Sequence, residues 1–254
     1  MELLKLDRTS SFAFGTVAAE YERRRPSYHP DIVAFVVERL GIAAGTTVVD
    51  VGAGTGKFTR LLVPTGARVL AVEPLAEMRA QLEGAVPGVE MLAGSAEDLP
   101  LGDASVDAAT AAAAFHWFEL DRALPELHRV LRPGGGLAIV RNHRDLAQPL
   151  QAAVQEIIGG YFPAESEFEL WRTELEAGGL FGPLEQIRRT FVQEFDADGL
   201  AERVSTMSYV ARLPDEERRR VLAEVRALGE AQPSTPFPFR YQSDAFVCRR
   251  RDGN

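Results

Sequence analysis

The sequence predicts an α/β fold in which a doubly wound, mostly parallel sheet is covered by helices on both faces. Two observations indicate this fold. From residue 46 onward, short apolar runs of strand length alternate with amphipathic stretches of helix length, the pattern of successive strand–helix–strand units. The first apolar run, 46–51, also leads directly into a glycine-rich loop and a helix start, and a parallel strand buried on both faces is typically such a continuous run.

The individual elements follow from the same patterns. Before the sheet, we expect a helix over 12–21, an extended link between Pro26 and Pro30, and an amphipathic helix over 31–40 ended by Gly41. Strands are expected at 46–51, 68–73, 89–93, 106–112, 136–141, 184–195 and 240–249. Helices are expected near 57–63, 75–83, 121–131, 148–160, 166–177, 198–211 and 214–229.

Composition limits the partners of the chain. It has 254 residues with 37 acidic and 28 basic side chains, and the net charge of -9 argues against a nucleic-acid backbone as the main partner. The only cysteine, Cys248, excludes an internal disulfide and a thiolate metal cluster. No histidine–carboxylate cluster has metal-ligand spacing, so we expect no metal. Without an apolar run of membrane-spanning length or a signal-peptide core, the sequence predicts a cytoplasmic protein, monomer or homodimer.

The glycine-rich loop is the strongest local signal. Residues 46–59 read TTVVDVGAGTGKFT, with glycines at 52, 54 and 56. A P-loop would need glycine at Val51 and a hydroxyl at Phe58, and the dinucleotide fingerprint would need its last glycine at Lys57. Both patterns are therefore broken, and a glycine turn without a ligand stays open beside a nucleoside site. Glu73 follows the next strand, where a carboxylate accepts two ribose hydroxyls at once.

The loop resembles motif I of the class I S-adenosylmethionine-dependent methyltransferases, in which the glycines lie against the methionine part of the cofactor. A second resemblance is the string Glu126 to Gly136, which is similar to the E-x-x-R-V-L-[RK]-P-G-G segment of the ubiquinone-biosynthesis-type small-molecule branch. Residues 114–118, AFHWF, resemble the trans-aconitate methyltransferases. The resemblance covers about 12–145 and implies a Rossmann-like, seven-stranded sheet with an antiparallel last strand.

The N-terminal segment also resembles this family. Its pattern F-x-x-x-A-x-x-Y-x-x-x-R-P-x-Y covers the cofactor in related enzymes, and by that resemblance Tyr21 and Arg25 hold the methionine carboxylate. The alternative is that Arg25 is one surface cation of a basic run. By this comparison residues 1–45 form a helical cover, 46–145 the cofactor-binding core, and 146–254 the rest of the sheet with helical substrate-cap insertions, all in one structural domain.

Further cofactor contacts are implied at the ends of the following strands. Met78 resembles the methionine that packs on the adenine ring, although a core methionine is the alternative. In AGSAEDLPL, Ser95 replaces the aspartate that usually meets the adenine amino group. Its hydroxyl can accept the same hydrogen bond more weakly, and the alternative is that the contact passes to Glu97 or to the Ala96 backbone. The resemblance implies this set of cofactor-binding residues: Tyr21, Arg25, Asp50, Gly52, Ala53, Gly54, Thr55, Gly56, Glu73, Pro74, Met78, Ser95, Ala96, Glu97, Ala113 and Phe115.

The implied reaction is transfer of a methyl group from S-adenosylmethionine to a small molecule. His116 and His143 fall at predicted strand ends, where either could act as a base for a hydroxyl or amine acceptor, and a structural role is the alternative. A carboxylate acceptor would need no base and would favour Arg141 and Arg144. The predicted substrate pocket comprises Trp117, Phe118 and Arg141. Further candidate lining residues, for each of which a core position is the favoured alternative, are Phe162, Trp171, Met207 and Tyr209. A cofactor-binding protein without activity and an NAD-dependent oxidoreductase remain as alternative functions.

Overall fold

A computed structural model describes residues 25–159 and 166–252, except for the side chains of 166–170 and 208. The contacts divide the chain into two compact units. The larger unit comprises Ser27–Asn142, Glu165–Arg189 and Ser243–Asn254, and the smaller unit comprises Met1–Pro26, His143–Ala164 and Thr190–Gln242. The division expected from the sequence, into a cover at 1–45, a cofactor-binding core at 46–145 and a substrate-cap region at 146–254, stays a prediction. The expected helix over 12–21, Tyr21 and Phe162 lie outside the described residues.

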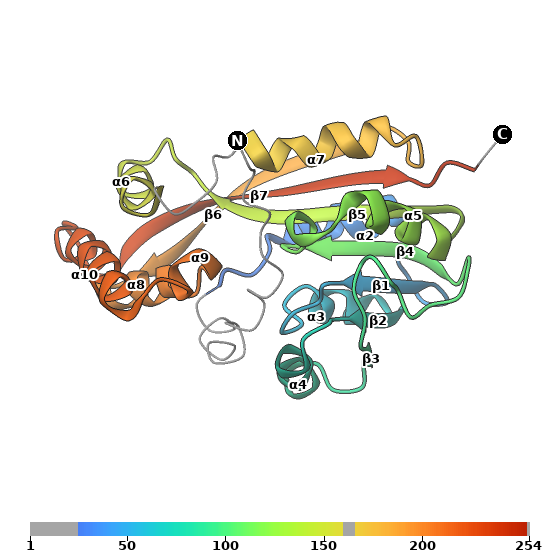
Figure 1. Ribbon diagram of the computed structural model, residues 1–254, viewed down its shortest axis with the longest axis horizontal. Coiled ribbons are helices and arrows are strands. Elements are labelled where there is room, and N and C mark those ends of the chain that lie inside the picture. The colour runs from blue at the N-terminus through green and yellow to red at the C-terminus, as the bar shows by residue number, and fades with distance from the viewer. Residues whose placement is uncertain (1–24, 160–165, 253–254) are drawn as a thin grey trace. The chain divides into compact units, whose positions relative to one another are not determined.

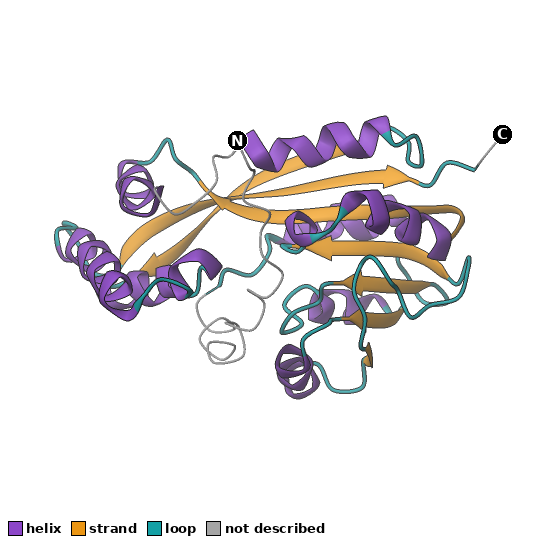
Figure 2. Cartoon of the chain, in the orientation of Figure 1, coloured by secondary structure: helices purple, strands orange, loops and turns teal. Residues whose placement is uncertain are grey.

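The sheet has seven strands in the order β3-β2-β1-β4-β5-β7-β6, mostly parallel with antiparallel last strands (Figures 1 and 2). This confirms the predicted fold. The strands are β1 (Thr47–Val51), β2 (Arg68–Val72), β3 (Glu90–Leu92), β4 (Val106–Ala112), β5 (Leu131–Arg144), β6 (Glu185–Phe195) and β7 (Phe237–Arg249). Strand β1 pairs in parallel with β2 on one side and with β4 on the other. The strand order therefore reverses between β1 and β4, where ligands of open α/β sheets bind.

Helices cover both faces of the sheet in the larger unit. On one face, apolar side chains of α5 (Leu120–Val130) and α7 (Ser166–Ala177) pack with β1, β2, β4 and β5. On the other face, α2 (Pro30–Leu40) and α3 (Thr59–Leu62) pack with the opposite side of the same strands. Helix α4 (Ala76–Ala85) adds Leu82 against Ala71 of β2. Helix α3 is only one turn and continues as the 3-10 turn η2 (Val63–Thr65).

The smaller unit is built from helices and the remaining parts of three strands. Helices α6 (Pro149–Ile158), α8 (Ala197–Ser205), α9 (Ser208–Ala211) and α10 (Asp215–Glu230) share an apolar core with β6 and β7. The helix expected over 198–211 is thus divided into α8 and α9. Gly229 lets α10 lie close to α8, because a Cβ there would stand 2.7 Å from the Ala197 Cα.

The structure corrects the expected start of the fifth strand. The sequence predicts a helix near 121–131 and a strand at 136–141, but α5 ends at Val130 and Leu131 already pairs with Val106. Pro133 and the glycines lie within a strand whose register shifts between Val106 and Ala108. Gly136 is needed there because a Cβ would lie 2.7 Å from the Cys248 carbonyl oxygen.

Candidate functional site

The glycine loop follows β1 at the point where the strand order reverses. Gly52, Gly54 and Gly56 all have positive φ angles, of 70°, 57° and 84°, which other residues rarely adopt. A Cβ on Gly52 would lie 2.6 Å from the Ala114 Cβ in the loop after β4, so close packing requires this glycine. A Cβ on Gly54 would meet nothing within 4 Å. The loop is therefore packed at Gly52 and open at Gly54, where a ligand can approach its backbone.

Glu73 ties the end of β2 to this loop. Its carboxylate, 5% exposed, accepts a hydrogen bond from the Gly54 N–H at 2.9 Å through Oε2 and one from the Leu75 N–H at 3.0 Å through Oε1. Burial raises the pKa of Glu73, against the opposing effect of these two backbone donors and of Arg79. The two strongest sequence signals, the loop and the acid, are thus brought together. Each carboxylate oxygen retains a further lone pair for a ligand hydroxyl.

Asp50 lies beneath the loop with 1% of its surface exposed. Its Oδ2 accepts the Thr59 hydroxyl at 2.6 Å and its Oδ1 accepts the Thr110 hydroxyl at 2.8 Å. Asp50 therefore connects β1 to α3 and to β4, whereas its predicted role in holding a cofactor stays a prediction. Thr110 was missed by the sequence reasoning, although it is a single hydroxyl in an alanine-rich strand. Burial raises the pKa of Asp50 to about 6.

This raised pKa predicts a pH-dependent stability. A carboxyl with a folded-state pKa above its unfolded value stabilises the fold below the unfolded pKa, and this stabilisation is lost as the pH rises through about 6. Urea unfolding of the protein and of Asp50→Asn should therefore show the parent losing roughly 2–3 kcal/mol relative to the variant between pH 4 and pH 7. A constant difference between the two proteins over that range would contradict the assignment.

The loop after β3 carries the predicted adenine contacts. The Ser95 carbonyl oxygen accepts from the Asp98 N–H at 3.2 Å, and Ala96 is buried. Glu97 is 7% exposed, and its Oε1 accepts from the Glu119 N–H, 2.8 Å away, at the start of α5. One oxygen of Glu97 is therefore used to hold α5 against this loop. Met78, the other predicted adenine contact, is buried on α4.

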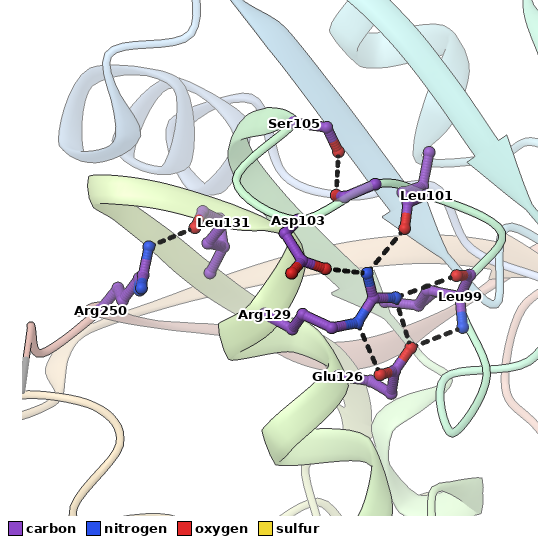
Figure 3. A network of polar contacts seen from close by, with 9 residues as sticks. Leu99, Leu101, Asp103, Ser105, Glu126, Arg129, Leu131 and Arg250 are labelled. Carbon is purple, nitrogen blue, oxygen red and sulfur yellow. Dashed lines mark hydrogen bonds and ion pairs between the residues drawn. The ribbon is translucent and has the colours of Figure 1, made fainter.

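The string from Glu126 to Gly136 has a structural role that the sequence did not reveal (Figure 3). Arg129 donates from Nη1 to the Leu101 carbonyl oxygen and to Asp103 Oδ1, both at 2.8 Å, and from Nη2 to Glu126 Oε2 at 2.7 Å. Glu126 in turn accepts the Leu99 N–H at 3.0 Å. The Arg129 hydrogen bond lowers the pKa of Glu126. This ion pair therefore fastens α5 to the loop that carries Ser95–Glu97.

Aromatic side chains gather at the end of β4. Ala113 has a positive φ of 54°, and the 3-10 turn η3 (Phe115–Trp117) follows it. The Phe115 ring lies 5.4 Å from the ring of Phe118 and 5.4 Å from that of Trp171. Trp171 also contacts Phe246 and belongs to the hydrophobic core, which is the alternative that the sequence favoured over a pocket-lining position.

The two candidate bases lie in different units. His116 is exposed on η3, with its ring 5.0 Å from that of Trp117. His143 is partly buried and lies in the smaller unit. In that unit the Arg25 Nη2 donates to the Thr206 carbonyl oxygen at 2.9 Å, and Tyr209 donates to the Met207 sulfur. The predicted contacts of Tyr21 fall outside the described residues.

Arg141 does not present an unpaired cation, as a substrate-pocket role would favour. Its Nε donates to Asp244 Oδ2 at 3.2 Å, and Arg188 Nε donates to the other oxygen of the same carboxylate at 2.6 Å. The Asp244 side chain is fully buried. An anionic substrate would therefore compete with a buried carboxylate for Arg141.

Neither a metal nor a membrane span is suggested by the described residues. Across 25–159 and 166–252, no group of three or more His, Cys, Asp or Glu side chains is arranged to hold a metal ion. In the same part of the chain, no helix has the length and apolar character needed to cross a bilayer.

The fold and the glycine loop with its acid define an α/β protein with a candidate nucleoside site at the carboxyl ends of β1 and β2. Residues 49–139 match the family described as "Methyltransferase domain". An uncharacterised methyltransferase of Mycobacterium tuberculosis is 37% identical over 227 residues, which cover 89% of each chain. A protein described as a type II methyltransferase from Anaeromyxobacter dehalogenans has a TM-score of 0.64 and 27% identity, covering 89% of this chain and 97% of its own.

A more distant structure shares the fold alone. The phosphoethanolamine N-methyltransferase 2 of Haemonchus contortus, solved with S-adenosylhomocysteine, has a TM-score of 0.56 and 17% identity over 98% of this chain and 59% of its own. The similarity to the Mycobacterium tuberculosis protein extends over 89% of each chain at 37% identity, and this shows the family of the present chain. The chain belongs to the methyltransferase family, as the resemblance predicted.

Proposed function

We propose that the chain transfers the methyl group of S-adenosylmethionine to an O, N or C atom of a small molecule by direct displacement. The observation that carries this proposal is the link between Glu73 and Gly54, which sets a buried carboxylate beside a glycine backbone with open space in front of it. Membership of the methyltransferase family supports the choice of cofactor. The related fold solved with S-adenosylhomocysteine supports it as well.

The residues of the loop would bind and orient the cofactor. Glu73 would accept the ribose hydroxyls, while Gly54 would let the methionine part lie against the backbone. Asp50 and Thr110 would keep the loop fixed from below, and Phe115 with Phe118 would exclude water from the reacting methyl group. The remaining residues of the cofactor set expected from the sequence, including Pro74 and Thr55, are proposed as contacts along the same strand ends.

Little further catalysis is required from side chains. The cofactor supplies an activated methyl group, and displacement breaks its carbon–sulfur bond as the acceptor lone pair forms the new bond. In-line placement of the acceptor then carries most of the rate. For a hydroxyl or amine acceptor, His116 or His143 is proposed as the base that removes the proton, whereas a carboxylate acceptor needs none. Trp117 and Phe118 are proposed as acceptor contacts.

Calorimetry with S-adenosylmethionine, S-adenosylhomocysteine and NAD tests the proposal. We expect micromolar binding of the two sulfur nucleosides, and loss of that binding in Gly54→Arg, whose side chain would fill the open space. Gly88→Arg is the matched control, because Gly88 also has a positive φ and nothing within 4 Å of its Cβ position, yet it precedes β3 at the opposite strand end. Binding of NAD alone, or of no nucleoside by the folded protein, would overturn the proposal.

A second measurement separates an enzyme from a binding protein. S-adenosylhomocysteine formation is followed with panels of small acids, phenols and amines. Turnover with any of them supports methyl transfer. Cofactor binding without turnover across all three panels would favour the alternative of a binding protein without activity.

A further inference from the structure

Arg203 is a buried guanidinium in the smaller unit for which the described residues supply no ionic partner. It lies on α8 with 6% of its surface exposed. Its Nη1 lies 3.5 Å from the Thr206 hydroxyl, at the outer limit of a hydrogen bond, and its Nε is buried without any hydrogen-bond partner. No carboxylate among the described residues pairs with it. A buried charge in this state is unfavourable unless something else compensates it.

Tyr241, whose ring lies beside this guanidinium, has a second buried donor that no described residue satisfies. The Arg203 Cζ lies 5.9 Å from the centre of the Tyr241 ring, which is itself packed against Phe191 and Phe239. The side chain is 1% exposed, and its hydroxyl is buried without a hydrogen-bond partner. Buried tyrosine hydroxyls usually find such a partner. Two neighbouring side chains therefore each have a buried donor that the described part of the chain does not use.

Two more guanidinium groups meet the same turn between α8 and α9. Arg25 donates to the Thr206 carbonyl oxygen, and Arg144 Nη1 lies 3.6 Å from the sulfur of the next residue, Met207. The other Arg144 contact is to the neutral side chain of Gln155, and its Nε is buried without a hydrogen bond. Three guanidinium groups thus converge on Thr206 and Met207, and two of them, Arg144 and Arg203, contact only neutral acceptors among the described residues.

The contrast with Arg129 shows what a structural arginine does in this protein. Arg129 bonds two carboxylates and two backbone carbonyl oxygens, so its charge and its donors are both satisfied within the fold. Arg203 contacts neither a carboxylate nor a backbone carbonyl oxygen among the described residues. A small oxyanion would supply both the missing charge and the missing acceptors.

We propose that the smaller unit binds a carboxylate or phosphate group of a small molecule through Arg203, Arg144 and the Tyr241 hydroxyl. All three side chains belong to that unit, and their donors and positive charge favour an acidic ligand. That this acid is the methyl acceptor rests on the proposed function. Anion binding itself does not, and the two can be measured separately.

Thermal unfolding and calorimetry with two anions test the inference. The probes are succinate and inorganic phosphate, and succinamide is the uncharged control. We expect an anion to raise the Tm by several degrees in a concentration-dependent way, with no effect of succinamide. Arg203→Gln and Tyr241→Phe should each weaken that binding by about 10-fold or more, because each removes a donor to the anion. Arg226→Gln is the matched control, because this exposed arginine of the same unit already pairs with Asp198 and Glu230.

The outcomes separate the ligand sources and the hypotheses. A response to succinate alone assigns the site to carboxylates, and a response to phosphate alone assigns it to phosphates. No anion response in the folded protein, or an equal response in Tyr241→Phe, overturns the inference. Without ligand, Arg203→Gln should unfold at the same or a higher temperature, since an uncompensated charge is removed, whereas a purely structural Arg203 predicts a lower Tm. S-adenosylhomocysteine affinity, measured in parallel, reports on the proposed function independently.

Discussion

Replacing Glu73 with glutamine is expected to weaken S-adenosylhomocysteine binding by about 100-fold or more. The carboxylate accepts from Gly54 and Leu75 through its two oxygens, so an amide must turn its NH₂ group toward one of these N–H donors. One link of the loop is lost, and so is one acceptor for the ribose. Two charge-assisted hydrogen bonds at about 1.5–3 kcal/mol each account for a loss of this size. Calorimetry on the folded variant measures it.

Glu90→Gln is the matched control for this substitution. Glu90 begins the neighbouring strand β3, and its exposed ion pair with Arg68 contributes little. We expect its cofactor affinity to equal that of the parent. Since burial raises the pKa of Glu73, the parent should also lose affinity on acidification at a higher pH than an ordinary glutamate would require. An affinity unchanged in Glu73→Gln would contradict the role assigned to this carboxylate.

The sequence predicted those parts of the site that depend on local structure. Glycines that need a positive φ, such as Gly54, and an acid that directly follows a strand can be recognised from neighbouring residues alone. The alternation of strands and helices gave the sheet, because the carboxyl ends of parallel strands meet at one edge. The hydrogen bond between Gly54 and Glu73 joins the two residues that carry these signals.

Contacts between distant segments were not predictable in the same way. The pairing of Arg141 with Asp244 joins two residues far apart in the sequence, so nothing near Arg141 indicated that its charge is already used. The contact between Arg203 and Tyr241 also joins distant segments, so the sequence around each residue showed only a helix arginine and a strand aromatic. The start of β5 was missed for the same reason, because the pairing of Leu131 with Val106 joins distant segments, whereas the proline and glycines after Leu131 locally indicate a turn.

Replacing Arg129 with alanine is expected to lower the free energy of unfolding by about 2–4 kcal/mol. The substitution removes the donors to Leu99, Leu101 and Asp103 and leaves Glu126 without its cation, while alanine keeps the helix propensity of α5 (Figure 3). Charge-assisted bonds of this kind are the strong ones, and partial exposure of the Arg129 side chain, 31%, keeps the total below their simple sum. Urea unfolding at neutral pH measures the difference.

The loop that carries Ser95–Glu97 should also respond to the Arg129→Ala substitution. Because Arg129 and Glu126 hold the Leu99 backbone, the loop carrying Ser95–Glu97 should exchange its amide hydrogens faster in Arg129→Ala. Arg122→Ala on the same helix is the control, since Arg122 makes only an exposed pair with Glu119 and should cost at most about 0.5 kcal/mol. Equal stability losses in the two variants, or unchanged exchange in the loop, would show that the ion pair does not fasten the loop to α5. A loss confined to Arg129→Ala would explain physically why this string accompanies the glycine loop in the sequence.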